Sequence, residues 1–398
     1  MVDDDVLALL APRLSSNDQH ILASLSKTLF QKIPRSSILD ITLQRSEAHD
    51  ASFVRWLVRN GHTLRELRII NAHVSSTAVW GAMYLAAKSL TRLTVDVKGF
   101  QFHPTFLDAC CALTSLDITC GTLVIPEYTW NRLAPTLRTL RLASDAYKTM
   151  TMHVATLPKL QTLVCTKVLP VNLSAALVPA LTSLTFRHLR FESILPALSE
   201  LTTLRHLAAP LCRLTYIPDE LEHLTALESI DMSWNALTGY TPQGFFEGDA
   251  FRSIHGLQKL RSLNISHNDL DMASMKELGD LSTTVLESLD ISCNPCAVLP
   301  ETGAYLRSLK SLTSSFVPRA KILAAAPNLD TIQIHGPCSS AYEPPCDQLG
   351  EGAWRLGGAS LASSKVRTLR IESASVPARV ACDVLDLCRA LPSVSLVM

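Results

Sequence analysis

Few side chains of this sequence combine the type and the spacing that catalysis or metal binding requires. Cys293 and Cys296 are separated by two residues, a spacing that suits a pair of zinc ligands. No second pair follows nearby, and Asn294 between them belongs to a recurring pattern, so we expect no metal site there. The twelve histidines have no spacing that pairs them as ligands. The chain also lacks the H-E-x-x-H, G-x-S-x-G, Walker and Rossmann patterns, so we expect no catalytic residues, no cofactor and no enzymatic activity.

The composition argues against several classes of partner. Lys+Arg and Asp+Glu both number 36, and the formal net charge of zero disfavours nucleic acid or a membrane surface as the partner. The chain starts MVDDD, without a basic region ahead of an apolar stretch, so we expect no signal peptide. The eleven scattered cysteines are then expected to be free, mostly buried thiols in a reducing compartment. These observations favour a cytoplasmic or nuclear protein.

One short phrase recurs along the chain and must supply the scaffold. It is clearest in LESIDMSWNAL (227–237), LRSLNISHNDL (260–270) and LESLDISCNPC (286–296). The alternation within L-x-L predicts a short strand with one buried face, and stacked copies would form a parallel sheet over a continuous apolar core. Weaker copies begin at Ile38, Leu64, Leu90, Leu113, Leu137, Leu160, Leu181, Leu204, Leu309, Leu329, Val366 and Leu391.

This phrase, L-x-x-L-x-L-x-x-N-x-L, strongly resembles the leucine-rich repeat. The resemblance implies an α/β fold, a leucine-rich-repeat solenoid (horseshoe) with a parallel sheet on its concave face, over residues 37–398 and about 15 repeats. It also implies that Asn235, Asn268 and Asn294 turn inward and bond the backbone of neighbouring loops. Between the strands, helical spacing after Val74 predicts helical returns in the early repeats. The Ile217-Pro218 pair predicts an extended or single-turn return instead.

Two repeats are longer than the rest and carry insertions at 239–253 and 336–360. The second is rich in Gly, Pro and Ser, which predicts a loop that projects from the solenoid. Both insertions are compatible with tolerated surface loops. Alternatively, Phe245-Phe246 or Trp354 could close over a bound partner.

Strand residues that point away from the core would form the concave, partner-binding face. In three different repeats, Trp234, His267 and Phe316 occupy one phase and would form an exposed aromatic stripe, or else pack against the next loop. A large aromatic side chain with a polar rim is typical of a protein-binding surface. We therefore expect a protein target to bind there. The candidate residues are Arg141, Arg187, His206, Trp234, His267 and Phe316, and the same face would carry Arg68, Arg92, Lys167, His188, Asp231, Asn264, Asp290 and Cys293.

The N-terminal stretch VLALLAPRLSSNDQHILASLSKTLF (6–30) predicts a pair of helices ahead of the first strand. Pro12 ends the first helix, because the residue before a proline is disfavoured in helical conformation. Ser15 and Asp18, three residues apart, form a capping-box pattern that starts the second helix. Ile21, Leu22, Leu25 and Leu29 then give the second helix an apolar stripe.

The layout of this segment, residues 1–36, resembles the F-box of F-box/leucine-rich-repeat proteins. The matching positions are Leu7, Leu10, Leu14, Asp18 and Leu25. The resemblance implies that the segment binds a Skp-family adaptor and that the chain is a substrate receptor of a cullin-type ubiquitin ligase, with the repeats holding the target.

A second interpretation of residues 1–36 stays open. The helices could merely cap the first repeat of an intracellular leucine-rich-repeat scaffold or inhibitor, because the end of any solenoid must be shielded from water. A docking module would leave some of its leucines exposed, whereas a cap would bury them.

Overall fold

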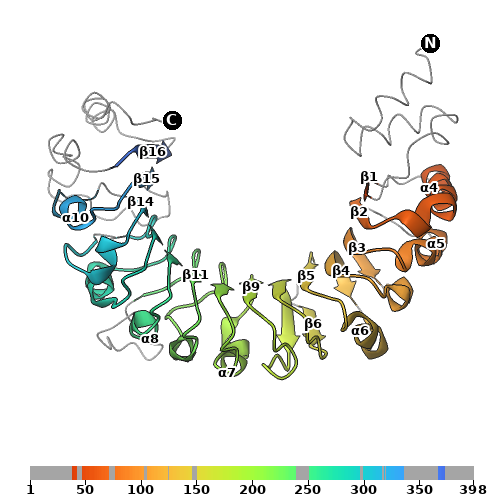
Figure 1. Ribbon diagram of the computed structural model, residues 1–398, viewed down its shortest axis with the longest axis horizontal. Helices are drawn as coiled ribbons and strands as arrows, with labels where there is room; N and C mark the ends of the chain where they lie inside the picture. The colour runs from red at the N-terminus through yellow and green to blue at the C-terminus, as the bar shows by residue number, and fades with distance from the viewer. Residues whose placement is uncertain are drawn as a thin grey trace, which may run out of the picture. The chain divides into compact units, whose positions relative to one another are not determined.

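The computed structural model of the chain describes residues 38–42, 47–70, 77–102, 105–123, 125–145, 150–238, 251–295, 299–315, 318, 320–335 and 366–372 (Figure 1). The chain divides into two compact units, Met1–Leu181 and Thr182–Met398. The N-terminal helices expected at 1–36, with Leu7, Leu10, Leu14, Asp18 and Leu25, lie outside the described residues, as do Phe316, the insertion at 336–360 and most of that at 239–253.

In the first unit, parallel strands lie side by side in chain order, with helices on one side of them (Figure 1). The strands are β1 (Ile38–Thr42), β2 (Glu66–Ile70), β3 (Arg92–Phe102), β4 (Ser115–Leu123), β5 (Thr139–Ser144) and β7 (Thr162–Thr166). The returns between them contain α4 (Glu47–Asn60), η2 (Gly61–Thr63), α5 (Thr77–Ala87), η3 (Thr105–Ala109) and α6 (Glu127–Leu133). A further parallel pair is formed by β6 (Met150–His153) and β8 (Val168–Val171).

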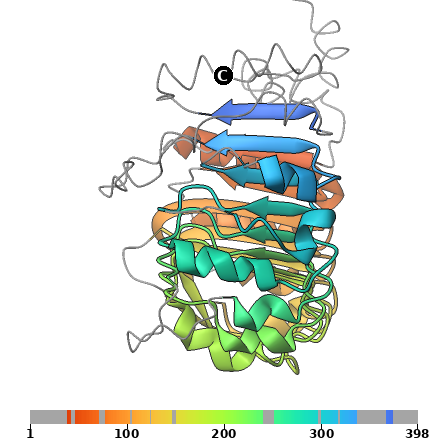
Figure 2. The ribbon, with the colours of Figure 1, turned by 90° about the vertical axis from the view of Figure 1, so that its left-hand side faces the viewer.

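The second unit repeats the arrangement with shorter strands, which point the same way in Figure 2. They are β9 (Ser183–Arg187), β10 (His206–Ala208), β11 (Ser229–Asp231), β12 (Ser262–Asn264), β13 (Ser288–Asp290), β14 (Ser311–Ser314), β15 (Thr331–His335) and β16 (Thr368–Glu372). The returns contain η4 (Phe191–Ile194), α7 (Leu195–Leu198), η5 (Asp219–His223), α8 (Arg252–His255), α9 (Met272–Glu277), η6 (Leu278–Asp280), η7 (Ala304–Arg307) and α10 (Ala320–Ala325).

The strand register confirms the repeat starts that the sequence predicts within the described residues, with one exception. In most copies the strand begins two residues after the predicted first leucine, as β11 does after Leu227 and β12 after Leu260. Ile38, in contrast, pairs with Glu66 rather than aligning with Leu64. The predicted start of the first copy is therefore wrong by two residues.

The apolar positions of each repeat form a continuous core within each unit. In the repeat at 227–237, Leu227, Ile230, Met232 and Leu237 are buried, and their counterparts in neighbouring repeats are equally buried. Burying each such side chain stabilises the fold by about 1.5–3 kcal/mol. A lone repeat has no second layer to bury these residues, so the repeats must stack.

The segments that connect the strands also match the predictions made from the sequence. The helix expected after Val74 is α5, and the single turn expected after Ile217-Pro218 is η5. The helices among the described residues are too short or too polar to cross a membrane.

Candidate functional site

Each unit presents one sheet face that is turned away from the leucine core, and we name it the open face. In the second unit its first row consists mostly of small hydroxyl side chains. The register places these residues on consecutive strands: Ser183, His206, Ser229, Ser262, Ser288, Ser311, Thr331 and Thr368. Small side chains keep this part of the face flat, so that the backbone of a bound chain can approach the strands closely.

The next row of the same face carries acidic and amide side chains on three adjacent strands. Asp231 pairs with Asn264, which pairs in turn with Asp290. In each of the three, Oδ1 accepts a hydrogen bond from the backbone N–H of the serine two residues later, at 3.0–3.1 Å. In the last two, Oδ1 also accepts the hydroxyl hydrogen of that serine, at 2.7 Å. The Oδ1 atom of each group is thus fixed to the turn that follows its strand.

Trp234 and His267 stack on each other at the exit of β11 and β12. Their ring centroids lie 3.6 Å apart, and the planes differ by 11°. Trp234 is 54% exposed, an unusual state for so large an apolar side chain. Leu211, at the equivalent position of the preceding repeat, is also exposed and donates its backbone N–H to the Trp234 carbonyl at 3.1 Å.

The backbone holds both rings in place. Trp234 (φ 56°) and His267 (φ 53°) adopt the left-handed conformation, which costs a non-glycine residue about 1–2 kcal/mol. Their N–H groups donate to the carbonyls of Ser266 and Ser292 in the following repeats, at 3.0 and 2.9 Å. The asparagines that directly follow, Asn235 and Asn268, bond the neighbouring loops and keep the turn in this shape.

The protonation of His267 depends on its surroundings. Partial burial against the indole lowers the pKa of the imidazole below its ordinary value, while the nearby Asp290 carboxylate raises it and His335 lowers it. Burial is the largest of these effects, and it favours the neutral form of the imidazole. The stack thus places two aromatic rings beside Asp290.

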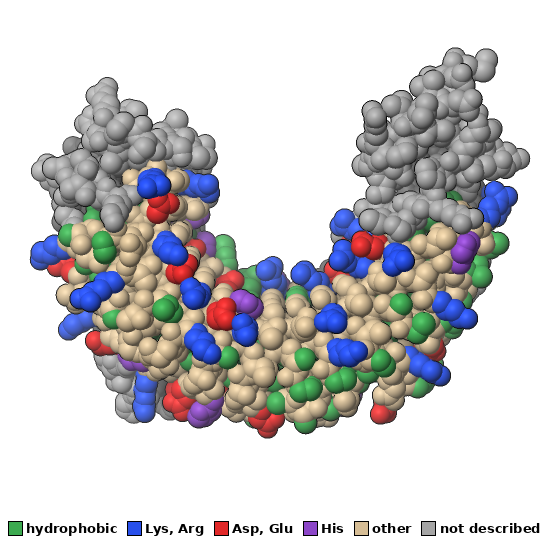
Figure 3. Space-filling view, in the orientation of Figure 1, with side chains coloured by type: hydrophobic (Ala, Val, Ile, Leu, Met, Phe, Trp, Pro, Cys, Tyr) green, Lys and Arg blue, Asp and Glu red, His purple; other side chains and the backbone are tan. Residues whose placement is uncertain are grey.

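A row of alternating charges lies just before the strands of the second unit, and we name it the charge row. Its members are joined one to the next by backbone hydrogen bonds of 2.7–2.9 Å. They are Arg205, Glu228, Arg261, Glu287, Lys310, Asp330 and Arg367. The alternation is visible as blue and red side chains in Figure 3.

Ion pairs connect neighbours within the charge row. Glu287 contacts both Arg261, at 2.6 Å, and Lys310, at 3.0 Å. Arg205 and Glu228 lie 3.1 Å apart. Lys310, by its hydrogen bond, and then Arg261 lower the pKa of Glu287. The charges of this row are thus compensated within the chain.

The open face of the first unit carries a smaller charged cluster. Arg141 on β5 lies in register beside Asp117 on β4, and both side chains are accessible. Burial raises the pKa of Asp117, while Arg141 and Arg68 lower it. Arg92 forms an ion pair with Glu66 at 3.3 Å.

The candidate residues predicted from the sequence fall into separate groups. Trp234 and His267 come together as the stack. Arg187 and His206 are exposed on β9 and β10 of the same unit. Arg141 belongs to the first unit.

Residues that could bind a metal or a small ligand are sparse in the described part of the chain. It contains no group of three or more His, Cys, Asp and Glu side chains that could hold a metal ion. Cys293 is disulfide-bonded, so the expectation of free thiols is wrong for this residue. Cys110, Cys120 and Cys165 are free and buried, as expected.

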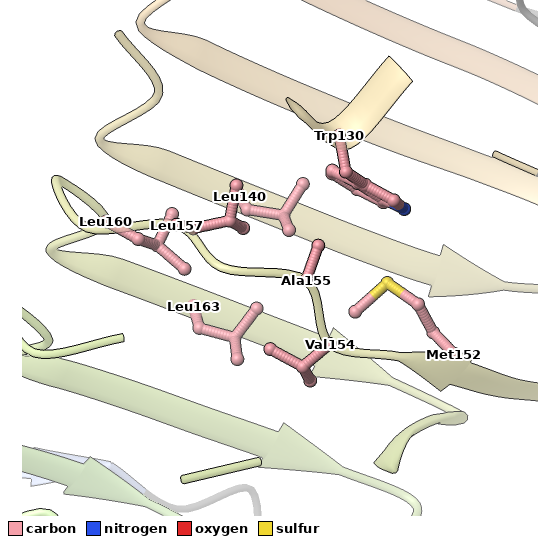
Figure 4. A pocket seen from close by; sticks show the side chains of 8 residues that line it. All are labelled: Trp130, Leu140, Met152, Val154, Ala155, Leu157, Leu160 and Leu163. Atoms are coloured by element: carbon pink, nitrogen blue, oxygen red, sulfur yellow. The ribbon is translucent and has the colours of Figure 1, made fainter. Parts of the chain in front are cut away.

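An apolar pocket lies in the first unit (Figure 4). Its lining is Trp130, Leu140, Met152, Val154, Ala155, Leu157, Leu160 and Leu163. The side chains converge so closely that a water molecule does not fit between them. This pocket is part of the core and is not a ligand site.

Sequence reasoning missed the charge row, although its signal was readable. The residue after the first leucine of each repeat alternates in sign, for example in LRHL, LESI, LRSL and LESL. It also missed Leu211, which joins the exposed row because it takes the left-handed turn position (φ 59°). That position can be read from the sequence as the residue before the repeat asparagine or its replacement, here Cys212.

Comparisons with known proteins give distant structural matches only. Neither a protein-family model nor a curated protein matches the chain. Among solved structures, an internalin of Listeria monocytogenes is 13% identical with a TM-score of 0.44, over 93% of this chain and 89% of that one. A leucine-rich-repeat protein of Leptospira interrogans is 16% identical with a TM-score of 0.44, over 90% of this chain and 100% of that one. The strand register and the buried repeat positions show that the described part of the chain has the leucine-rich-repeat fold.

Proposed function

We propose that this chain is a non-enzymatic repeat scaffold that binds a protein partner on the open face of its second unit. The observation that carries the proposal is the exposed indole of Trp234, which is stacked on His267 and held by a strained turn. Because the fold holds this large aromatic ring in water on a rigid support, less conformational entropy is lost when a partner binds it. Tryptophan is also enriched among the residues that dominate binding at the centres of protein interfaces.

The size of the expected contribution follows from the exposed area. A tryptophan side chain buries up to about 250 Å², and roughly half of Trp234 is exposed, so a partner could cover about 125 Å². At about 25 cal/mol per Å² this coverage is worth about 3 kcal/mol, close to a hundredfold in affinity. The flat hydroxyl row beside the ring allows the partner to reach it.

The proposal is tested by selecting a phage-displayed random dodecapeptide library against the full chain. Binders are then measured against Trp234→Ala and against Tyr128→Ala, a control that removes an exposed aromatic side chain from α6 of the other unit. We expect the first variant to lose about a hundredfold in affinity and the control to lose nothing measurable. Binders that tolerate Trp234→Ala would contradict the proposal.

A more specific role is proposed for residues 1–36: they dock a Skp-family adaptor, so that the scaffold serves as the substrate receptor of a cullin-type ubiquitin ligase. Its support is the F-box resemblance at Leu7, Leu10, Leu14, Asp18 and Leu25. In this role the chain performs no chemistry and raises the effective concentration of the target near the ligase.

The adaptor proposal has a direct binding test. Purified Skp-type adaptor should bind the full chain, and Leu10→Ala with Leu14→Ala should abolish binding, whereas Leu85→Ala, an exposed leucine on α5, should not. If the adaptor does not bind, or if the double variant precipitates while Leu85→Ala stays soluble, the segment is a cap and the chain is a scaffold or inhibitor only.

A further inference from the structure

The open face of the second unit carries two carboxylates that form no ion pair with arginine or lysine among the described residues. Asp231 and Asp290 each use Oδ1 for the turn that follows, and no ion pair engages either of them within the described ranges. The acids of the charge row differ in this respect, since Glu228 and Glu287 contact arginine or lysine at 2.6–3.1 Å. The negative charge beside Trp234 is therefore not compensated by arginine or lysine among the described residues.

The spacing of these groups defines what would fit them. Asp231, Asn264 and Asp290 occupy one row on adjacent strands. Neighbouring strands lie about 4.8 Å apart, so the two carboxylates are about 10 Å apart with an amide between them. Two cationic side chains match this distance on one face of a chain when they are three residues apart in a polyproline II segment or seven apart in a helix.

The aromatic stack selects among the possible cations. His267 interacts with Asp290 and stacks on Trp234, and burial lowers the pKa of its imidazole, which disfavours a competing positive charge there. A guanidinium group can bond a carboxylate in bidentate fashion and also stack on an aromatic ring, whereas an ammonium group bonds as a point charge. The pairing of carboxylates with an exposed indole thus favours arginine over lysine.

We infer that the partner bound on this face is a basic, arginine-bearing protein segment, with cationic side chains at Asp231 and Asp290 and one guanidinium against Trp234. This inference rests on the proposed function and specifies its partner. The negative charge of the face also disfavours acidic segments and nucleic acid, because their carboxylates or phosphates would meet like charge at Asp231 and Asp290.

The structure supplies a well-matched variant for the test. The Oδ1 of Asn264 accepts the same backbone N–H bond as that of Asp231 and the same two bonds as that of Asp290, so Asp231→Asn with Asp290→Asn should remove charge and keep the fold. The control, Glu228→Gln with Glu287→Gln, removes the same charge from the charge row. Both are compared with the wild-type full chain.

Dodecapeptides selected on the wild-type chain from the random library are sequenced and then measured by fluorescence anisotropy. We expect enrichment in arginine, at least a tenfold loss of affinity with the Asp231/Asp290 variant, and less than a threefold change with the control. Equal losses with both variants, or arginine replaced by lysine without loss, would overturn the inference.

The two proposals fail in different ways. If the selected peptides depend on Trp234 but are not basic, the face binds protein segments and the inference about arginine is wrong. If no selected peptide depends on Trp234, the proposed function and the inference are both wrong.

Discussion

Replacing Asn268 by alanine should reveal how strongly adjacent repeats are coupled. This side chain is 4% exposed and lies between two repeats. Its Oδ1 accepts the backbone N–H of Leu237 at 3.0 Å, and its Nδ2 donates to the carbonyls of Met232, Ile265 and Ser266 at 2.9–3.1 Å. Alanine can make none of these four bonds.

The cost of the change falls mainly on one group, because the carbonyls keep other donors. Met232 still accepts from Asn235, and the other two carbonyls still accept from Asn294 and from the Trp234 amide. The buried N–H of Leu237 has no replacement, and an orphaned buried donor costs about 1–3 kcal/mol. With the weakened carbonyl bonds included, we expect the free energy of unfolding to fall by about 2–4 kcal/mol.

The assay is urea unfolding followed by far-UV circular dichroism, with hydrogen exchange at the Leu237 amide as the local measurement. The matched control is Asn328→Ala, which removes an exposed asparagine whose Nδ2 donates to a single carbonyl, that of Arg307, at 2.7 Å. The control should lose less than about 1 kcal/mol. If Asn268→Ala loses no more than the control, or if exchange at Leu237 is not accelerated, the argument about the orphaned donor is refuted.

Three further predictions follow from protonation. Burial raises the pKa of Cys110 to about 12, so iodoacetamide should modify the exposed Cys111 in the native protein and reach Cys110 only on unfolding, as peptide mass spectrometry would show. The pKa of His267 is lowered in the folded state, so the unfolded chain binds a proton more readily. This histidine therefore destabilises the fold as pH falls below about 6.5. Between pH 7.5 and pH 5, the urea midpoint of the wild type should fall more than that of His267→Asn. An equal fall in both midpoints would contradict this prediction. Lys310→Ala should raise the pKa of Glu287 towards its ordinary value in a carboxyl NMR titration, and an unchanged titration would contradict the assigned cause.

Much of the scaffold could be predicted from the sequence, because each strand is marked by leucines that must face the core. Leu227 and Leu260 place their strands correctly for this reason. The prediction is wrong at Ile38, where the first copy has no leucine two residues before its strand and apolar alternation alone leaves the phase undetermined by two residues. The spacing between copies, which varies along the chain, does not settle this phase either. The pairing of Ile38 with Glu66 settles it, and that pairing is visible only in the structure.

The site was less predictable than the scaffold. The sequence places Trp234 and His267 in one phase, but their contact depends on left-handed turns in consecutive repeats, which no side-chain pattern specifies. It also gives Asp231 and Asp290 as ordinary members of the repeat. That no arginine or lysine of the described residues forms an ion pair with them emerges only from the structure, in which the charge row pairs with itself.

The strict alternation of the charge row constrains how an array of this kind can change its length. Deleting the single repeat that carries Glu287 would place Arg261 directly beside Lys310, and duplicating one repeat would likewise juxtapose equal signs. Deleting or duplicating two consecutive repeats restores the alternation. Recombination that adds or removes repeats in this unit should therefore be tolerated best in pairs, which makes two repeats, rather than one, the unit of copy-number change.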